Sequence, residues 1–246
     1  MKKTITTMIA AGLVASVATA SVDVTLDFAS AYVFRGVTFN DGLVFQPGIE
    51  AAGLGLPEEY GSVAVGAWGN YDIDDYDETL ASSEFSEVDW YASYSLPTLV
   101  DGLDLYVGYT EYTYPGAEGG ADKEGNLGLG YEIAGVGLGY TAYFNVGSGA
   151  KNVYNEFTLG YGLDISEELA ASVYGHVAYL AADEGDSGMH DGSLGADIGY
   201  ALGEVWSVGA SLTYIAQLDD EILVDVEQGG GYDVNVVGML SLGASF

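Results

Sequence analysis

The chain ends with the sequence YDVNVVGMLSLGASF, residues 232–246. Every second residue from Tyr232 to Phe246 is apolar or glycine, with an aromatic residue at each end, and the residues between them are mostly polar or small. A β-strand places successive side chains on opposite faces, so this pattern predicts a strand with one apolar and one polar face. Such a strand, when tilted, rises roughly 35 Å, which is the length of a membrane-spanning strand with an aromatic residue at each interface.

The same alternation recurs along the rest of the chain. It predicts a first strand that carries Val22 to Phe34 on its outward face and runs on to Arg35, and a third strand near Ser62–Asp72. We count about twelve strands, an even number as in bacterial barrels. Long connections, at 72–87, 115–123, 181–190 and 218–231, alternate with tight turns such as Ala134-Gly135, and a short first connection is expected near Asn40. The predicted fold is all-β: residues 21–246 form a single transmembrane antiparallel up-and-down β-barrel.

The N-terminus has the features of a secretory signal peptide over residues 1–20. Lys2 and Lys3 precede an apolar run, and Ala18-Thr19-Ala20 is a typical cleavage pattern. The apolar run is too short to cross a membrane as a helix, and no later stretch reaches the required length of about 18 apolar residues. The chain contains no cysteine. We therefore expect an exported protein in the outer membrane of a Gram-negative bacterium, stabilised by a closed barrel instead of disulfides.

The chain is strongly acidic. Its formal net charge is −32, and loss of Lys2 and Lys3 with the signal peptide would leave −34. Such a charge makes nucleic acid a very poor partner. Acidic residues are dense at 72–87, 183–191 and 219–227. Two interpretations stay open: these loops are simply solvated, or they bind divalent cations weakly, although none carries the EF-hand pattern.

The inner face of the predicted barrel is the better place to look for function. It carries many glycines, which favour an open lumen, together with carboxylates that would attract cations. The alternative is a lumen plugged by paired polar groups. Arg35 could pair with an inner acid or form a positive spot at a constriction. The predicted pore-lining residues are Asp27, Arg35, Glu50, Asp89, Glu132, Glu156, His176 and Asp197.

The sequence gives little support for catalysis. It has only two histidines: His176 is predicted to face inward, beside Ser172 and Tyr174, and His190 to lie in an outer loop. A serine hydrolase needs a histidine beside its nucleophile, and a single inner histidine is more often structural or pore-lining. There is no zinc-ligand spacing, phosphate loop or nucleotide motif. We expect no enzyme activity, no cofactor and no metal centre.

The segment SAYVFRGV, residues 30–37, resembles the N-terminal region of the TorF-like porin family. The resemblance covers about 25 residues around this segment; the following Thr38-Phe39-Asn40-Asp41 departs from the family, which usually has Ser or Gln there. It implies an outer-membrane barrel with a passive-channel role, and Arg35 is the only site residue that it carries over.

The sequence therefore predicts an outer-membrane, porin-like channel for passive diffusion of small hydrophilic solutes, with a preference for cations. The alternative is a non-conducting barrel with a structural or adhesive role through its acidic loops. Outer-membrane lipid and small solutes or cations are the expected partners, and homo-oligomerisation stays open.

Overall fold

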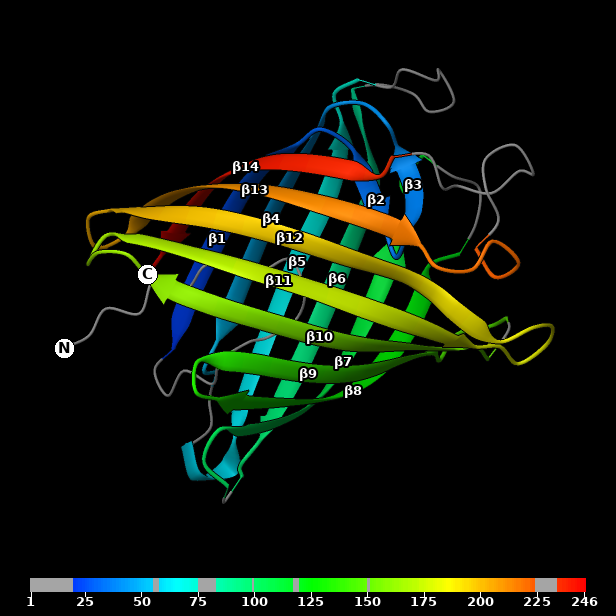
Figure 1. Ribbon diagram of the computed structural model, residues 1–246, viewed down its shortest axis with the longest axis horizontal. Helices are drawn as coiled ribbons and strands as arrows, with labels where there is room; N and C mark the ends of the chain where they lie inside the picture. Colours follow the sequence, from blue (N-terminus) through cyan, green and yellow to red (C-terminus); the bar gives the residue numbers. More distant parts are fainter. Residues whose placement is uncertain are drawn as a thin grey trace.

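The computed structural model describes residues 20–54, 58–74, 83–98, 100–116, 120–149, 151–223 and 234–246. All but the last residue of the predicted signal peptide lies outside these residues. Twelve antiparallel strands form a closed barrel, and a separate two-stranded hairpin, β2–β3, accompanies it (Figure 1). No helix in the described part of the chain has the length and apolar character needed to cross a membrane.

Neighbouring barrel strands follow one another along the chain, except where the hairpin intervenes between β1 and β4. The strands are 9 to 15 residues long, enough to cross a bilayer when tilted. A 3₁₀ turn, η1 (Glu58–Tyr60), lies between β4 and β5. The barrel strands are β1 (Ser21–Ala29), β4 (Val44–Ala52), β5 (Ser62–Asp72), β6 (Glu84–Leu96), β7 (Leu103–Thr113), β8 (Asp122–Ile133), β9 (Val136–Asn145), β10 (Val153–Asp164), β11 (Leu169–Ala181), β12 (Gly188–Leu202), β13 (Trp206–Gln217) and β14 (Val236–Ser245).

The barrel closes between its first and last strands. β1 and β14 pair from Asp23↔Ser245 to Ala29↔Met239, and the Phe246 backbone N–H donates to the Val22 carbonyl at 3.0 Å. Closure satisfies the backbone groups that an open sheet edge would expose to lipid. The start of β1 and the end of β14 lie at the same end of the barrel (Figure 1), and we call the opposite end, where β1 stops and β4 begins, the far end.

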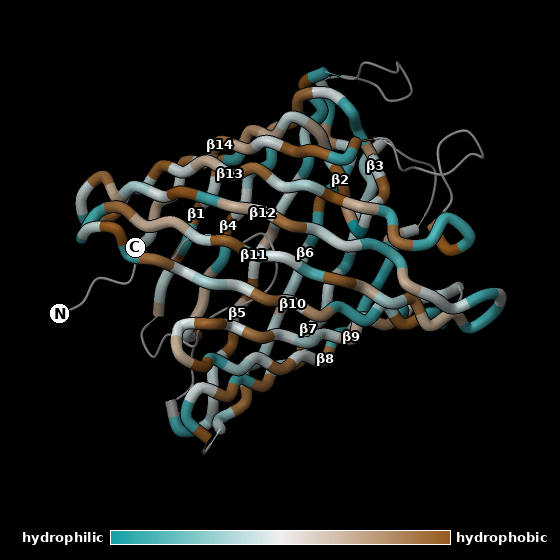
Figure 2. Tube along the Cα trace, in the orientation of Figure 1, coloured by the Kyte–Doolittle hydropathy of each residue, from teal (hydrophilic) through white to brown (hydrophobic). Residues whose placement is uncertain are grey.

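The two faces of the strands differ as the alternation predicts. Trp90, Leu212 and Leu240 point outward and are 58%, 60% and 64% exposed. A large apolar exposure spread over every strand fits contact with lipid and would be unusual for a soluble barrel. In Figure 2 the hydrophobic residues are spread along the strands, and the hydrophilic ones gather toward the connections. The inward neighbour of Trp90, Asp89, is buried.

Inner tyrosines lie against glycines of the adjacent strand. A side chain on Gly66, Gly128 or Gly195 would collide with the ring of Tyr91, Tyr106 or Tyr174, respectively. The rings therefore lie flat along the wall, in space that only glycine leaves free. Some of the inner glycines thus make room for aromatic rings, and not for solvent alone.

The predicted all-β barrel of twelve strands is confirmed, and β5 has the predicted bounds. The terminal strand begins later than predicted, at Val236 and not at Tyr232, which lies outside the described residues. The cause is local: the Val234 N–H donates to Thr38 Oγ1 of β3 at 3.0 Å, so the chain approaches the hairpin there before it joins β13.

The first predicted strand is wrong beyond Ala29. β1 ends there, and the chain folds into β2 (Tyr32–Phe34) and β3 (Val37–Asn40) before β4 begins at Val44. Tyr32 is buried and packs with Ala29 and Val44, instead of facing lipid. The first connection is consequently long, although the sequence predicted a short one. The alternation of apolar residues continues through Tyr32 and Phe34. Because the period is two whether the apolar side chains of a strand face lipid or the bore, the pattern did not reveal that β1 ends at Ala29.

Candidate functional site

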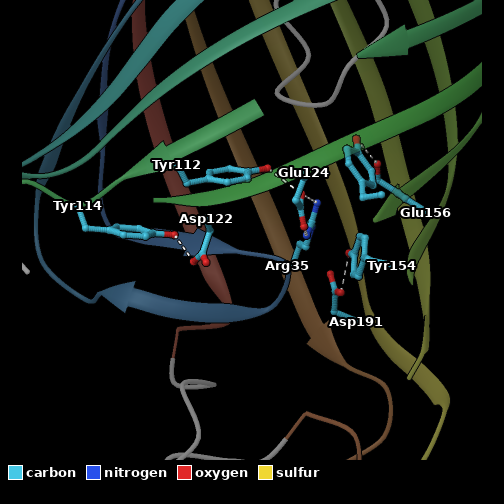
Figure 3. Close-up of polar contacts among 9 residues, drawn as sticks. Arg35, Tyr112, Tyr114, Asp122, Glu124, Tyr154, Glu156 and Asp191 are labelled. Carbon is cyan, nitrogen blue, oxygen red and sulfur yellow. Dashed lines mark hydrogen bonds and ion pairs between the residues drawn. The ribbon is translucent and has the colours of Figure 1, made fainter. Parts of the chain in front are cut away.

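The β2–β3 hairpin extends across the bore, the space that the barrel encloses. It leaves the wall between β1 and β4, and its tip residue Arg35 contacts side chains of β8, β9 and β10. These strands lie opposite β1 in the order of the closed barrel. The hairpin therefore spans from one wall to the other near the far end (Figures 1 and 3).

Arg35 fastens the tip of the hairpin to the opposite wall. Its two terminal guanidinium nitrogens donate to the two carboxylate oxygens of Glu124, each at 2.8 Å. Both side chains are only 18% exposed. The guanidinium carbon lies 4.6 Å and 4.4 Å from the ring centres of Tyr143 and Tyr154. Burial alone would lower the pKa of Arg35, but the Glu124 carboxylate outweighs burial and raises it, so the pair is ionic.

The turn at the tip of the hairpin holds Arg35 in a left-handed backbone conformation that is unfavourable for arginine. Arg35 and Gly36 form a two-residue turn with φ values of 49° and 75°. Such turns favour Asn-Gly, and a residue such as arginine costs about 1 kcal/mol in this conformation. Gly36 is required: a Cβ there would lie 2.8 Å from the Cβ of Asp191 on β12. The tip thus touches the wall closely on a second side.

The base of the hairpin is fixed by further polar contacts. The Tyr32 hydroxyl donates to Glu87 of β6 at 2.7 Å, and its ring centre lies 5.5 Å from that of Trp68 on β5. The Asn40 side-chain amide donates to Asp72 at 2.8 Å. Three separate points of attachment make the hairpin a fixed part of the bore.

A buried carboxylate, Asp191, organises the wall beside the tip. Its side chain is fully buried and accepts hydrogen bonds from Tyr154 at 2.8 Å, His176 at 2.7 Å and His190 at 2.8 Å. Because Tyr154 also packs under Arg35, this network and the Arg35–Glu124 pair form one continuous cluster (Figure 3).

A cavity of about 350 Å³ lies between the hairpin and the wall. Its lining includes the Arg35–Glu124 pair and His190, with aromatic rings from both sides. Its residues are Phe34, Arg35, Val37, Phe39, Glu124, Tyr143, Asn145, Asn152, Tyr154, Leu180 and His190. Space for solvent therefore remains beside the hairpin, at the far end.

The predicted pore-lining residues are spread along the wall. By strand alternation Asp27, Glu50, Glu156, His176 and Asp197 face inward, as Asp89 does. Glu132 also lies on the inner face, but next to the Ala134-Gly135 turn, at the end of the barrel opposite the far end. Arg35 faces the bore from the hairpin and not from the first strand. Whether these residues contact a passing solute remains a prediction.

Four inner carboxylates have a buried oxygen without a donor. Among the described residues no hydrogen-bond partner reaches Oδ1 of Asp27, Asp89 or Asp197, or Oδ2 of Asp72, although Ser172 donates to the other oxygen of Asp197. A carboxylate oxygen that the protein leaves unsatisfied needs water or a cation. Among the described residues, however, no group of three or more histidine and acidic side chains is arranged to hold a metal ion. The acids at 75–78 and 225–227 lie outside these residues.

Glu124 and Asp191 were not predicted as site residues from the sequence. The connection predicted at 115–123 ends just before Glu124, but β8 begins at Asp122, and Glu124 continues the inward series of Asn126 and Gly128. Asp191 and His190 belong to β12, so the prediction of His190 in an outer loop is wrong. Here the register with β11 shifts between Val177 and Tyr179, and a single sequence does not reveal such a shift.

His176 has partners that resemble a hydrolase triad. Ser193 Oγ lies 2.7 Å from His176 Nδ1, and His176 Nε2 lies 2.7 Å from Asp191. Hydrolysis also requires donors for a developing oxyanion. Around Ser193 the backbone of β12 is paired with β11 on one side and β13 on the other. The backbone N–H groups there take part in strand pairing and do not point to a common oxyanion position. The arrangement is that of a buried polar network in the wall.

Solved structures with a similar fold are outer-membrane barrels. The COG4313 outer membrane channel from Pseudomonas putida F1 has a TM-score of 0.61 at 10% identity, over 95% of this chain and 97% of that one. The NanC porin has a TM-score of 0.54 at 10% identity, over 92% and 98%. Outer membrane phospholipase A from Escherichia coli has a TM-score of 0.50 at 12% identity, over 92% of each chain. At such identities the likeness concerns the fold, which places this protein in the bacterial outer membrane.

The sequence profile of one family matches residues 12–246. No curated protein matches the sequence. The chain belongs to the family described as "Bacterial protein of unknown function (Gcw_chp)".

Proposed function

We propose that this member of the Gcw_chp family is an outer-membrane channel through which small hydrophilic solutes diffuse passively, with a preference for cations. A closed barrel with a polar inner face, together with porin and channel neighbours, supports a porin-like role. The neighbours also include an enzyme, so the fold alone does not define the activity. The TorF-like resemblance of residues 30–37 points to the same channel role.

The charge balance of the bore supports the cation preference. Residues 21–246 contain only three basic side chains, Arg35, Lys123 and Lys151. Arg35 is neutralised by Glu124. Lys123 pairs with Glu111, and Lys151 donates to the Gly147 carbonyl, at 3.5 Å and 2.6 Å. The inner carboxylates thus determine the sign of the field in the bore, and acidic walls favour cations.

Reversal potentials in planar bilayers test this proposal. In a potassium chloride gradient the wild type should show discrete conductance steps and a cation-biased reversal potential. Neutralising Glu50, Asp89 and Glu156 by amides should reduce that bias, because the three carboxylates face the bore. Glu167→Gln, in the exposed turn between β10 and β11, is the matched control and should leave the bias unchanged. An unchanged bias in the triple variant would show that inner carboxylates do not select the ion.

The alternative function is a non-conducting barrel with a structural or adhesive role. The hairpin in the bore is the observation that favours it, and electrical silence of the wild type would support it. We further propose that the protein is not an enzyme: it should not hydrolyse phospholipids or p-nitrophenyl esters. An esterase activity that His176→Ala abolishes would contradict this view. Divalent-cation binding by the acidic loops and self-association remain separate proposals, to be tested by calorimetry and by light scattering.

A further inference from the structure

We propose that the β2–β3 hairpin is the size-selecting element of the channel, fastened across the bore by Arg35. This inference rests on the proposed channel function and adds to it the structural basis of the solute limit. The argument starts from where the hairpin begins and ends.

The hairpin is an excursion that the barrel itself does not need. Ala29 at the end of β1 pairs directly with Val44 at the start of β4. The two strands are thus already neighbours, and a two-residue turn would be enough to join them. The chain instead inserts a segment that leaves the wall, crosses the bore and returns to the same point. A segment of this kind contributes to the bore more than to the closure of the barrel.

The contacts hold the hairpin in one position. Arg35 binds the opposite wall through a bidentate ion pair, Tyr32 binds β6, and Asn40 binds β5. Bidentate pairs between arginine and carboxylate are among the stronger and more directional contacts in proteins. Arg35 also occupies a turn position that suits asparagine better. Its side chain, and not the turn, accounts for an arginine at the tip.

The space beside the hairpin suggests the class of solute. The cavity next to the tip measures about 350 Å³. At about 30 Å³ per water molecule, this equals the volume of about twelve waters, or roughly one disaccharide. The Arg35–Glu124 pair in its lining carries no net charge, so the constriction adds no barrier against neutral solutes. We infer that neutral or cationic solutes up to the size of a disaccharide pass, and that trisaccharides do not.

The test compares the wild type with a variant in which residues 31–42 are replaced by Asn-Gly. This change keeps the Ala29–Val44 pair and Leu43, whose carbonyl accepts from the Ile73 N–H. Liposome swelling would be measured with glycerol, glucose, sucrose and raffinose, and conductance in planar bilayers. The matched control replaces the exposed residues Asp183–Asp186 of the β11–β12 connection by Asn-Gly. Heat modifiability on gels verifies that each barrel is folded.

We expect the wild type and the control to admit glycerol, glucose and sucrose and to exclude raffinose. The hairpin variant should admit raffinose, and its conductance should rise several-fold. If the wild type conducts and the variant has the same solute limit, the inference is wrong and the channel function stands. If neither the wild type nor the hairpin variant conducts, both the size-selecting role of the hairpin and the proposed channel function are wrong. A silent wild type with a conducting hairpin variant would mean that the hairpin closes the bore, which supports its role and revises the function.

A second variant serves if the hairpin replacement does not fold. Arg35→Asn keeps a favourable turn sequence and removes only the guanidinium. Raffinose entry should then begin, at a rate between those of the wild type and a fully open barrel. A folded Arg35→Asn channel with an unaltered solute limit and unaltered conductance would show that the Arg35 attachment does not set the size limit.

Discussion

Removing the charge of Arg35 should weaken the docking of the hairpin by about 3 kcal/mol. Breaking a buried ion pair by loss of one partner costs about 3–5 kcal/mol, and we take the lower end because each side chain keeps 18% of its surface exposed. This is a change of about a hundredfold in the docking equilibrium. Arg35→Asn is the suitable substitution, because Asn-Gly is the preferred sequence for this turn and the change adds no turn strain. It relieves about 1 kcal/mol of strain instead, so the net loss in this variant should be about 2 kcal/mol.

A double-mutant cycle isolates the ion pair. Glu124→Gln alone leaves Arg35 without its charged partner, and it should destabilise the hairpin to a similar extent. The double variant leaves no unpaired charge, so it should be destabilised by less than the sum of the two, with a coupling of about 2 kcal/mol.

The chain provides its own reporter for this measurement. Of the three tryptophans, only Trp68 lies next to the hairpin, with its ring centre 5.5 Å from that of Tyr32. Trp90 and Trp206 are exposed on the outer face and can be replaced by phenylalanine. Urea titration of this single-tryptophan protein in detergent micelles would report hairpin release through Trp68 fluorescence. Additivity of the two single variants within about 0.5 kcal/mol would refute the reasoning, because it is the behaviour of distant or solvent-screened charges.

Three further predictions concern the wall. Leu212→Arg, on the lipid face of β13, should destabilise the folded barrel by about 2–4 kcal/mol, whereas Ser211→Arg on its inner face should cost far less; equal losses in urea unfolding would mean that the faces are wrongly assigned. Gly195→Ala should destabilise the barrel by about 1–3 kcal/mol, because its Cβ would meet the Tyr174 ring, and Gly162→Ala, with no atom within 4 Å, should be nearly neutral in the same titration. Asp191→Asn removes the negative charge and replaces one of the two oxygens that accept from Tyr154, His176 and His190 by a donor, and should speed proteolysis of the hairpin more than Asp183→Asn does; equal cleavage rates would show that this network does not stabilise the hairpin.

The barrel could be predicted from the sequence because its signal is repeated in every strand. Each strand must alternate apolar and polar residues, and the bounds of β5 follow from that rule alone. The hairpin could not be predicted in this way. Tyr32 and Phe34 continue the alternation of β1, and period two is the same whether the apolar side chains face lipid or pack inside the bore.

The partners of the candidate site were only partly accessible to sequence reasoning. The alternative of Arg35 pairing with an inner acid is confirmed, and the acid is Glu124. Extending the inward series from Gly128 back through Asn126 would have found it. Asp191 and His190 depend on a shift in the β11–β12 register, which arises from pairing between strands and leaves no mark in either strand's own pattern.

The seam between β1 and β14 has a consequence for how this protein is made. The seam joins the first and last strands of the barrel in chain order, and the hairpin immediately follows β1, so it is synthesised before β14. Contacts such as that between Thr38 and Val234, 196 residues apart, form only when the cylinder is sealed. The hairpin therefore need not be inserted into a barrel that has already closed, because the strands can assemble around it. If β1 and β14 paired before the hairpin had entered the bore, the hairpin would be left outside the barrel.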